Sequence, residues 1–298
     1  MKKDYRQLLE PKIINSISGL SLIARVIVDG YLSGLNQSRR VGAGLEFSQY
    51  RGYEPGDDMR LLDWKMLARS GRYYIKQSEI DTHISVKFII DASKSMLHTE
   101  EGLSKMDYVK VMTASLAHLA QKQGDAVGLY ALNDKNLKSI QPTVQKQHFN
   151  RFLHQLIAIE GEGKWPQNAV SLNQIHDKSK KELVFFITDM HEYDIELTSL
   201  IKGLKTMRNE VVVLQVMGKN ELEFDYKGFV IFEDLETGAE VKVDAKEAKR
   251  TYLDALTMKM NETKNMLLSQ NIAYQLFKLD EPMAEALQLF LKRRSSLT

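Results

Sequence analysis

Two aspartates at the ends of apolar runs are the residues of this sequence best suited to chemistry. The stretch FIIDASKSM at 88–96 carries Asp91, Ser93 and Ser95, one carboxylate and two hydroxyls at alternate positions. A second apolar run, LVFFIT, ends in Asp189. Oxygen ligands of this kind suit a hard divalent cation, above all Mg²⁺, which takes few protein ligands and keeps several waters. We therefore predict that these four side chains form one site for Mg²⁺, or for Mn²⁺ or Ca²⁺ in its place.

The elements around the two aspartates are predicted to form a doubly wound, mostly parallel α/β sheet. From residue 83 onward, apolar runs of strand length alternate with stretches of helical periodicity. Open α/β sheets bind ligands at the carboxyl ends of their strands, so Asp91 and Asp189 are expected at one edge. Strands are expected at 84–90, 126–132, 183–188, 210–217 and 272–279, and helices at 104–123, 145–159, 194–208, 245–269 and 282–294.

The chain is expected to divide near residue 82. Residues 1–82 would hold an N-terminal helix, from about Pro11 to Tyr31, and a glycine-punctuated section that packs on the main domain. Residues 83–298 would form the α/β domain. An insertion at about 218–244 breaks its alternation and reads as two short strands joined by a turn.

Composition sets broad limits on function. The 298 residues are 43% hydrophobic and 27% charged, which is typical of a globular protein. A formal net charge of +2 gives no electrostatic reason to expect nucleic acid as a partner. The chain has no cysteine, which excludes disulfides and thiolate metal sites. Neither a phosphate-binding loop of the Gly-x-x-x-x-Gly-Lys type nor a Gly-x-Gly-x-x-Gly loop occurs, so nucleotide binding is not indicated.

One segment, 13–35, is apolar enough to raise the question of a membrane. Arg25 and Asp29 interrupt it, and the uncharged run before them is 12 residues long. Spanning a bilayer needs roughly 20 predominantly apolar residues. We therefore expect an amphipathic helix that packs on the protein, no membrane insertion and a cytoplasmic location.

A longer pattern upstream of the first aspartate is more specific. The section Gly42–Glu79 resembles the signature of a bacterial family, domain-of-unknown-function family number fifty-eight, with the pattern G-x-G-x-E-F, R-x-Y, G-D-D-x-R, D-W and A-R. The resemblance also takes in the 183–189 strand and the closing EALQLFLKRR. The signature positions that we expect to act in interaction or structure are Glu46, Arg51, Tyr53, Gly56, Asp57, Asp58, Arg60, Asp63, Trp64 and Arg69.

The resemblance implies a fold, a metal and a partner. The Asp-x-Ser-x-Ser triplet is similar to the metal-ion-dependent adhesion site of von Willebrand factor A-like domains, in which Mg²⁺ accepts a carboxylate from a binding partner. Proteins like this are typically encoded beside MoxR-type AAA+ ATPases, which are thought to assemble or activate other proteins. The implied function is a non-enzymatic, metal-assisted adaptor for such an ATPase or its client protein.

One position departs from a complete adhesion site. The resemblance implies a threonine in a second loop, at a Gly-x-Thr step, but the loop here reads Gly161-Glu162-Gly163. Glycine has no side-chain oxygen, so a water or Glu162 would have to take the place of the threonine. Lys164 follows directly and is expected to bring a positive charge near the site.

Two other functions stay open. The first is a metal-dependent hydrolase that uses Asp91 and Asp189, with Glu162 as a further carboxylate. The second is an adaptor whose metal site is degenerate and which binds through the Gly42–Glu79 section. Acidic and basic residues alternate in that section, which favours a network of structural ion pairs over a second catalytic site, with Tyr53 and Trp64 as packing anchors.

Overall fold

A computed structural model describes most of the chain in two units. The described residues are 9–38, 49–53, 62, 64–77, 84–145, 147–166, 175, 181–191 and 196–295. One unit combines Met1–Leu32 with Ile84–Thr298, and the other is Ser33–His83. The N-terminal helical residues therefore group with the α/β domain, although the predicted boundary at residue 82 placed them with the signature section.

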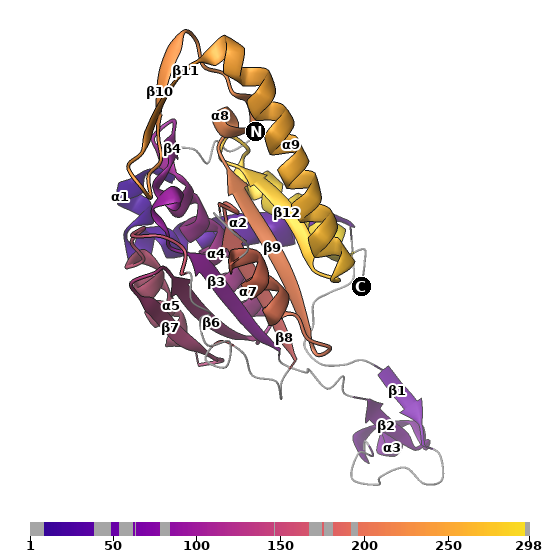
Figure 1. Cartoon of the computed structure of the whole chain (residues 1–298). Coiled ribbons are helices and arrows are strands. Elements are labelled where there is room, and N and C mark those ends of the chain that lie inside the picture. Colours follow the sequence, from indigo (N-terminus) through magenta and orange to yellow (C-terminus); the bar gives the residue numbers. More distant parts are fainter. Residues whose placement is uncertain are drawn as a thin grey trace. The chain divides into compact units, whose positions relative to one another are not determined.

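The larger unit is built on a six-stranded sheet (Figure 1). All neighbouring strands are parallel except the edge pair of β6 and β7. Strand β3 lies inside the sheet, with β6 and β7 on one side of it and β8, β9 and β12 on the other. The predicted doubly wound, mostly parallel sheet is confirmed. In spatial order the strands are β12 (Ala273–Lys278), β9 (Asn209–Met217), β8 (Glu182–Thr188), β3 (Ser85–Asp91), β6 (Ala126–Leu132) and β7 (Leu137–Thr143).

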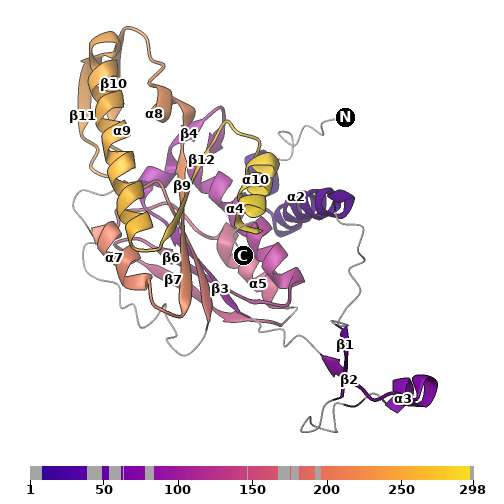
Figure 2. The same ribbon diagram turned by 90° about the vertical axis from the view of Figure 1, so that its right-hand side faces the viewer.

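Helices cover both faces of this sheet because its strands are apolar on both sides (Figure 2). Phe88 and Ile90 point into one core, while Ile89 between them points into the other. The first core is closed by α4 (Lys105–Lys122), α5 (His148–Ile157), α10 (Met283–Ser295) and the N-terminal helices. The second is closed by α7 (Glu196–Leu204) and the end of α9 (Ala245–Ser269).

The N-terminal region differs from the single helix that was predicted. It forms α1 (Pro11–Ile14) and α2 (Ile17–Ser38), and the break lies at Asn15 and Ser16. The Ser16 hydroxyl accepts a hydrogen bond from the Gly19 N–H at 3.1 Å, which caps the second helix. Gly30 and Gly34, predicted to end the helix, lie inside it.

The apolar face of α2 explains its composition. Leu20, Ile23, Ala24 and Ile27 are buried in the first core. Among the described residues, no helix is long and apolar enough to cross a membrane.

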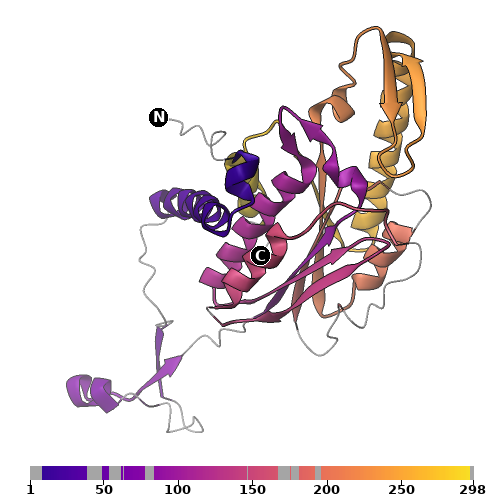
Figure 3. The same ribbon diagram turned by 90° about the vertical axis from the view of Figure 1, so that its left-hand side faces the viewer.

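The insertion after β9 forms a separate hairpin, as predicted (Figure 3). A short helix, α8 (Lys219–Glu223), precedes β10 (Phe229–Glu233) and β11 (Glu240–Asp244), which pair only with each other among the described strands. The edge strand β7 was not predicted, because its sequence LKSIQPT mixes polar residues with a proline. Proline is tolerated on an edge strand, where one side of the ladder has no partner.

The smaller unit contains the described part of the signature section. A two-stranded antiparallel sheet joins β1 (Gln49–Gly52) to β2 (Tyr74–Gln77), and α3 (Trp64–Ser70) lies between them in the sequence.

Candidate metal site

Asp91 lies at the buried carboxyl end of β3, where the strand order of the sheet reverses. Its Oδ1 accepts a hydrogen bond from the Ser93 N–H at 3.0 Å, and its Oδ2 accepts one from the Thr188 hydroxyl at 2.7 Å. Both donors are uncharged. The carboxylate is therefore held in place without a positive charge from either of these neighbours.

Two hydroxyls lie directly beside this carboxylate. Ser93 is buried and precedes a 3₁₀ turn, η3 (Lys94–Leu97), which brings Ser95 back toward it. The two Oγ atoms lie 2.9 Å apart and share a hydrogen bond. The alternate spacing in the sequence thus becomes a cluster of one carboxylate and two hydroxyls.

Asp189, at the end of the neighbouring strand β8, has a different environment. Its Oδ2 accepts a hydrogen bond from the Lys105 ammonium at 2.9 Å, and its Oδ1 accepts one from the His191 N–H at 3.1 Å. Lys105 is buried and also donates to Glu221 of α8 at 2.7 Å. The second strand-end carboxylate is therefore already paired with a buried cation.

These environments move the two pKa values in opposite directions. Burial, together with the charge of Asp189, raises the pKa of Asp91 to about 6. Burial also acts to raise the pKa of Asp189, but the charge and hydrogen bond of Lys105 outweigh it and lower that pKa below its usual value. Of the two strand-end aspartates, Asp91 is thus the one whose negative charge is less compensated at neutral pH.

Lys105 was missed by sequence reasoning, although one signal could have indicated it. Lys105 is the first residue of α4, after Ser104, whose hydroxyl caps the helix by accepting from the Asp107 N–H. A cation is disfavoured at a helix N-terminus because the helix dipole is positive there. A lysine at this position therefore indicates that acidic partners lie nearby.

The second loop explains why a threonine is absent. Gly163 has φ of +65°, and a Cβ added there would lie 1.9 Å from Oδ1 of Asp134. The loop is fixed against the triplet because the Lys94 N–H donates to the Gly163 carbonyl at 3.1 Å and the Glu162 N–H donates to the Ala92 carbonyl at 2.9 Å. A threonine does not fit this backbone. Glu162, proposed as its substitute, instead forms an ion pair with Lys135 at the surface.

A third acidic residue, not foreseen from the sequence, belongs to this region. Glu236 lies in the turn between β10 and β11, and its Oε1 is buried without a hydrogen-bond partner. Burial and the negative charges of Asp91 and Asp189 raise the pKa of Glu236 to about 7, while Lys164 opposes this. Its carboxyl group therefore shares the electrostatic field of the site.

The donor set fits a divalent cation that keeps part of its water shell. Among the described residues, no group of three or more His, Cys, Asp or Glu side chains is placed to hold a metal ion. An ion here would depend on Asp91, on the hydroxyls of Ser93 and Ser95 and on water, which is the coordination that Mg²⁺ favours. The unpartnered oxygen of Glu236 and the uncompensated charge of Asp91 are both features that a cation would stabilise.

The signature residues are only partly described. Glu46, Gly56, Asp57, Asp58, Arg60 and Asp63 lie outside the described residues, and of Arg51 only the backbone, in β1, is described. The rings of Tyr53 and Tyr73 lie 6.2 Å apart. Trp64 exposes 60% of its surface on α3, so the prediction that it anchors packing is wrong, and Arg69 on the same helix is also exposed.

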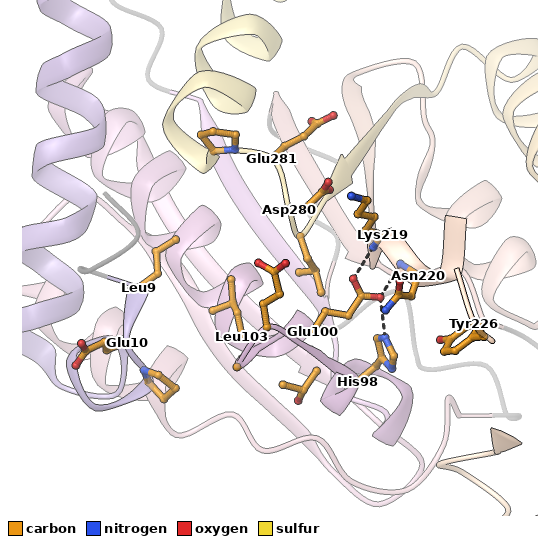
Figure 4. A pocket seen from close by; sticks show the side chains of 16 residues that line it. Leu9, Glu10, His98, Glu100, Leu103, Lys219, Asn220, Tyr226, Asp280 and Glu281 are labelled. Carbon is orange, nitrogen blue, oxygen red and sulfur yellow. Dashed lines mark hydrogen bonds and ion pairs between the residues drawn. The ribbon is translucent and has the colours of Figure 1, made fainter. Parts of the chain in front are cut away.

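An acidic cavity of about 650 Å³ lies next to the η3 turn (Figure 4). Glu100 projects from β4 (Thr99–Glu100) into its wall and accepts hydrogen bonds from the N–H groups of Lys219 at 2.7 Å and Asn220 at 2.9 Å. His98 contacts the same carboxylate at 3.3 Å. Glu100 thus fixes the first turn of α8, the helix that presents Glu221 to Lys105.

Comparisons with known proteins agree with the sequence resemblance. The family model described as "Protein of unknown function DUF58" matches residues 49–263. An uncharacterized protein of Mycobacterium tuberculosis, Rv1480, is 22% identical over 231 residues, which cover 77% of this chain and 73% of the relative.

Solved structures were also found to be similar. BatB, a conserved hypothetical protein from Bacteroides thetaiotaomicron, is 12% identical, with 72% of this chain and 99% of that one covered at a TM-score of 0.45. A von Willebrand factor type A structure from Catenulispora acidiphila is 14% identical, with 73% and 42% covered at a TM-score of 0.38. The fold assignment depends on the strand order of the sheet, not on these scores.

Proposed function

We propose that this chain, which belongs to the DUF58 family of proteins of unknown function, is a non-enzymatic protein-interaction module with a metal-assisted site. The side chains that would hold the ion are Asp91, Ser93 and Ser95, with Asp189 close by. When bound, Mg²⁺ would supply an electrophilic position that a carboxylate of a partner protein can fill.

The arrangement of the triplet at the end of β3 is the observation that supports this proposal. One buried carboxylate without a cationic partner and two hydroxyls 2.9 Å apart face the same region. Neutral hydroxyl ligands leave most of the charge of a divalent cation uncompensated. The chain's own role is to hold these oxygens in place, through the Ser93 N–H and the Thr188 hydroxyl.

We infer that the partner is a MoxR-type AAA+ ATPase or its client, as the resemblance to this family implies. The adaptor would present its metal-dependent surface while the ATPase supplies energy for assembly or activation of other proteins. No feature of the described residues favours nucleic acid over protein as the partner.

A metal-dependent hydrolase is the weaker candidate for specific reasons. Asp189 is held by Lys105, and Glu162 is held by Lys135. The observed partners of these carboxylates favour charge pairing over proton transfer.

An adaptor that binds through the Gly42–Glu79 section remains the second candidate. One observation favours it. Trp64 and Tyr73 expose 60% and 56% of their surfaces, which is unusual for large aromatic side chains and typical of contact surfaces.

Titration of the metal-stripped protein with Mg²⁺ and with Mn²⁺, followed by calorimetry, tests the proposal. We expect binding by the wild type and none by the Asp91→Ala variant. Capture of the purified ATPase should then require Mg²⁺, stop in chelator and fail with the same variant. If the Asp91→Ala variant captures the ATPase as well as the wild type does, the metal-assisted adaptor is wrong and the Gly42–Glu79 surface becomes the better candidate.

A matched control is available on α9. Asp254 has a side chain that is 77% exposed and lies on a helix far from the triplet in the sequence. The Asp254→Ala variant removes the same charge and should leave both metal binding and ATPase capture unchanged. Circular dichroism of each variant verifies that it is folded.

A further inference from the structure

The β10–β11 hairpin is a separate element that reaches the metal site with its tip. Among the described strands, its two strands pair only with each other. Figures 1 and 3 both show the end of the hairpin between β10 and β11 beside the η3 turn that follows Asp91. An insertion far along the chain from the triplet thus returns to the same edge of the sheet.

The half of this hairpin nearer its tip is fixed to the rest of the domain by aromatic side chains. Phe224 contacts Tyr252 of α9 and Phe232 of β10, with ring centroids 4.8 Å and 5.5 Å apart. The Tyr252 hydroxyl donates to the Glu221 carbonyl at 2.9 Å. Since Glu221 also binds Lys105, this half of the hairpin is connected to the Asp189 side of the site.

The tip itself is a tight turn with a defined shape. The Asp234 carboxylate accepts hydrogen bonds from the Glu236 N–H at 2.8 Å and the Thr237 N–H at 3.2 Å. The Gly238 N–H donates to the Asp234 carbonyl at 2.7 Å, and Gly238 adopts a φ of +71°. This turn fixes the backbone from which Glu236 projects.

The environment of Glu236 is unfavourable for an ionised carboxylate. Its Oε1 is buried and has no hydrogen-bond partner, although most buried polar atoms in proteins have one. The negative charges of Asp91 and Asp189 act on it, and Lys164 is the cation that opposes them. A divalent ion between Asp91 and Glu236 would supply the missing partner for the unpaired oxygen.

From this geometry we infer that Glu236 is an internal carboxylate ligand of the metal site, which the hairpin places at the position that a partner carboxylate would take. The inference rests on the proposed function, because it assigns a ligand to the same ion. It adds that, in the isolated protein, Glu236 of the hairpin occupies the open coordination position of the ion. A partner carboxylate must then displace Glu236 from the ion.

Metal titration of a set of matched variants tests the inference. Glu236→Gln keeps the size of the side chain and removes its charge, while Glu233→Gln makes the same change at an exposed position of the same hairpin. We expect Glu236→Gln to weaken Mg²⁺ binding by roughly 10-fold or more, the range seen when a partner of a metal centre is lost. Glu233→Gln should bind Mg²⁺ as the wild type does.

Hydrogen exchange provides a second readout that does not depend on function. Mg²⁺ should slow exchange of the backbone amides of residues 229–244 in the wild type and in Glu233→Gln, but not in Glu236→Gln. If Glu236→Gln binds Mg²⁺ like the wild type, and the hairpin exchanges equally with and without the ion, Glu236 is not a ligand, whereas loss of binding in Asp91→Ala alone would leave the proposed function intact. If no variant and no wild-type protein binds metal, both proposals are wrong.

Discussion

The two strand-end aspartates of this protein have similar sequence contexts and opposite electrostatic environments. Asp91 and Asp189 each follow an apolar run and end neighbouring parallel strands, β3 and β8. Asp189 is paired with the buried ammonium of Lys105, whereas Asp91 accepts hydrogen bonds from an amide and a hydroxyl. The strand determines where each carboxylate lies, and the helix packed behind it determines whether its charge is balanced.

The two aspartates therefore have different roles in the site. The ammonium of Lys105 balances the charge of Asp189 and connects it to α8 through Glu221. Asp91 keeps a charge that a cation can still satisfy. A metal at this edge of the sheet therefore belongs on the Asp91 side, among hydroxyls, rather than midway between the two aspartates.

Replacement of Lys105 by methionine should have the largest effect on stability. It would leave Asp189 and Glu221 without their shared cation, and breaking a buried ion pair by removing one partner costs roughly 3–5 kcal/mol. The free energy of unfolding, measured with denaturant, should fall by about this amount. Lys122→Met is the matched control, because the Lys122–Asp29 pair is solvent-exposed and such pairs contribute at most about 1 kcal/mol. Equal losses in the two variants would mean that Lys105 has no special role.

The second largest effect is expected in the pH dependence of stability, to which the two aspartates should contribute with opposite signs. A carboxyl whose pKa is raised on folding stabilises the folded state fully below its unfolded pKa of 3.8, and this contribution is lost as the pH rises through about 6. For Asp91 the difference corresponds to about 3 kcal/mol. Asp189, with a lowered pKa, acts in the opposite sense and loses its contribution only as the pH falls below its usual value.

Asp91→Asn isolates the contribution of Asp91. In chelator, the variant should be more stable than the wild type at pH 7, and the difference should shrink as the pH is lowered toward 4. Saturating Mg²⁺ should reduce the difference at pH 7, because it stabilises the ionised carboxylate of the wild type alone. A difference in stability that does not change with pH would show that ionisation of Asp91 does not destabilise the folded state. The contrast drawn between Asp91 and Asp189 would then be wrong.

The sequence predicted the framework of this site better than its electrostatics. Asp91, Ser93, Ser95 and Asp189 were found because strand-end positions follow from local apolar patterns and from the rule that parallel strands share one carboxyl edge. Lys105 and Glu236 were not foreseen. Lys105 is 84 residues from Asp189, and Glu236 reaches the site only through a hairpin whose direction depends on packing against α9.

The fold shows the same limit in two places. Helix α2 continues through Gly30 although glycine favours helix ends, since burial of Leu20, Ile23 and Ile27 outweighs the local propensity. Strand β7 escaped prediction because it lies at the edge of the sheet, and several of its residues are exposed. In both cases tertiary contacts decide what the local sequence leaves open.

Substitution of Gly163 should have the smallest effect and would sharpen the account of the Asp91 side. Because Gly163 has φ of +65°, a side chain there should cost about 1–2 kcal/mol of stability. Its Cβ would point toward Asp134. Gly163→Thr should therefore lose at least as much stability as Gly163→Ala in denaturant unfolding, because a β-branched side chain fits a positive φ even less well than alanine. Neither variant should bind Mg²⁺ more tightly in calorimetry. Tighter Mg²⁺ binding by the threonine variant alone would mean that the loop rearranges and supplies a hydroxyl ligand to the ion. The site at Asp91 would then depend on a ligand from this loop.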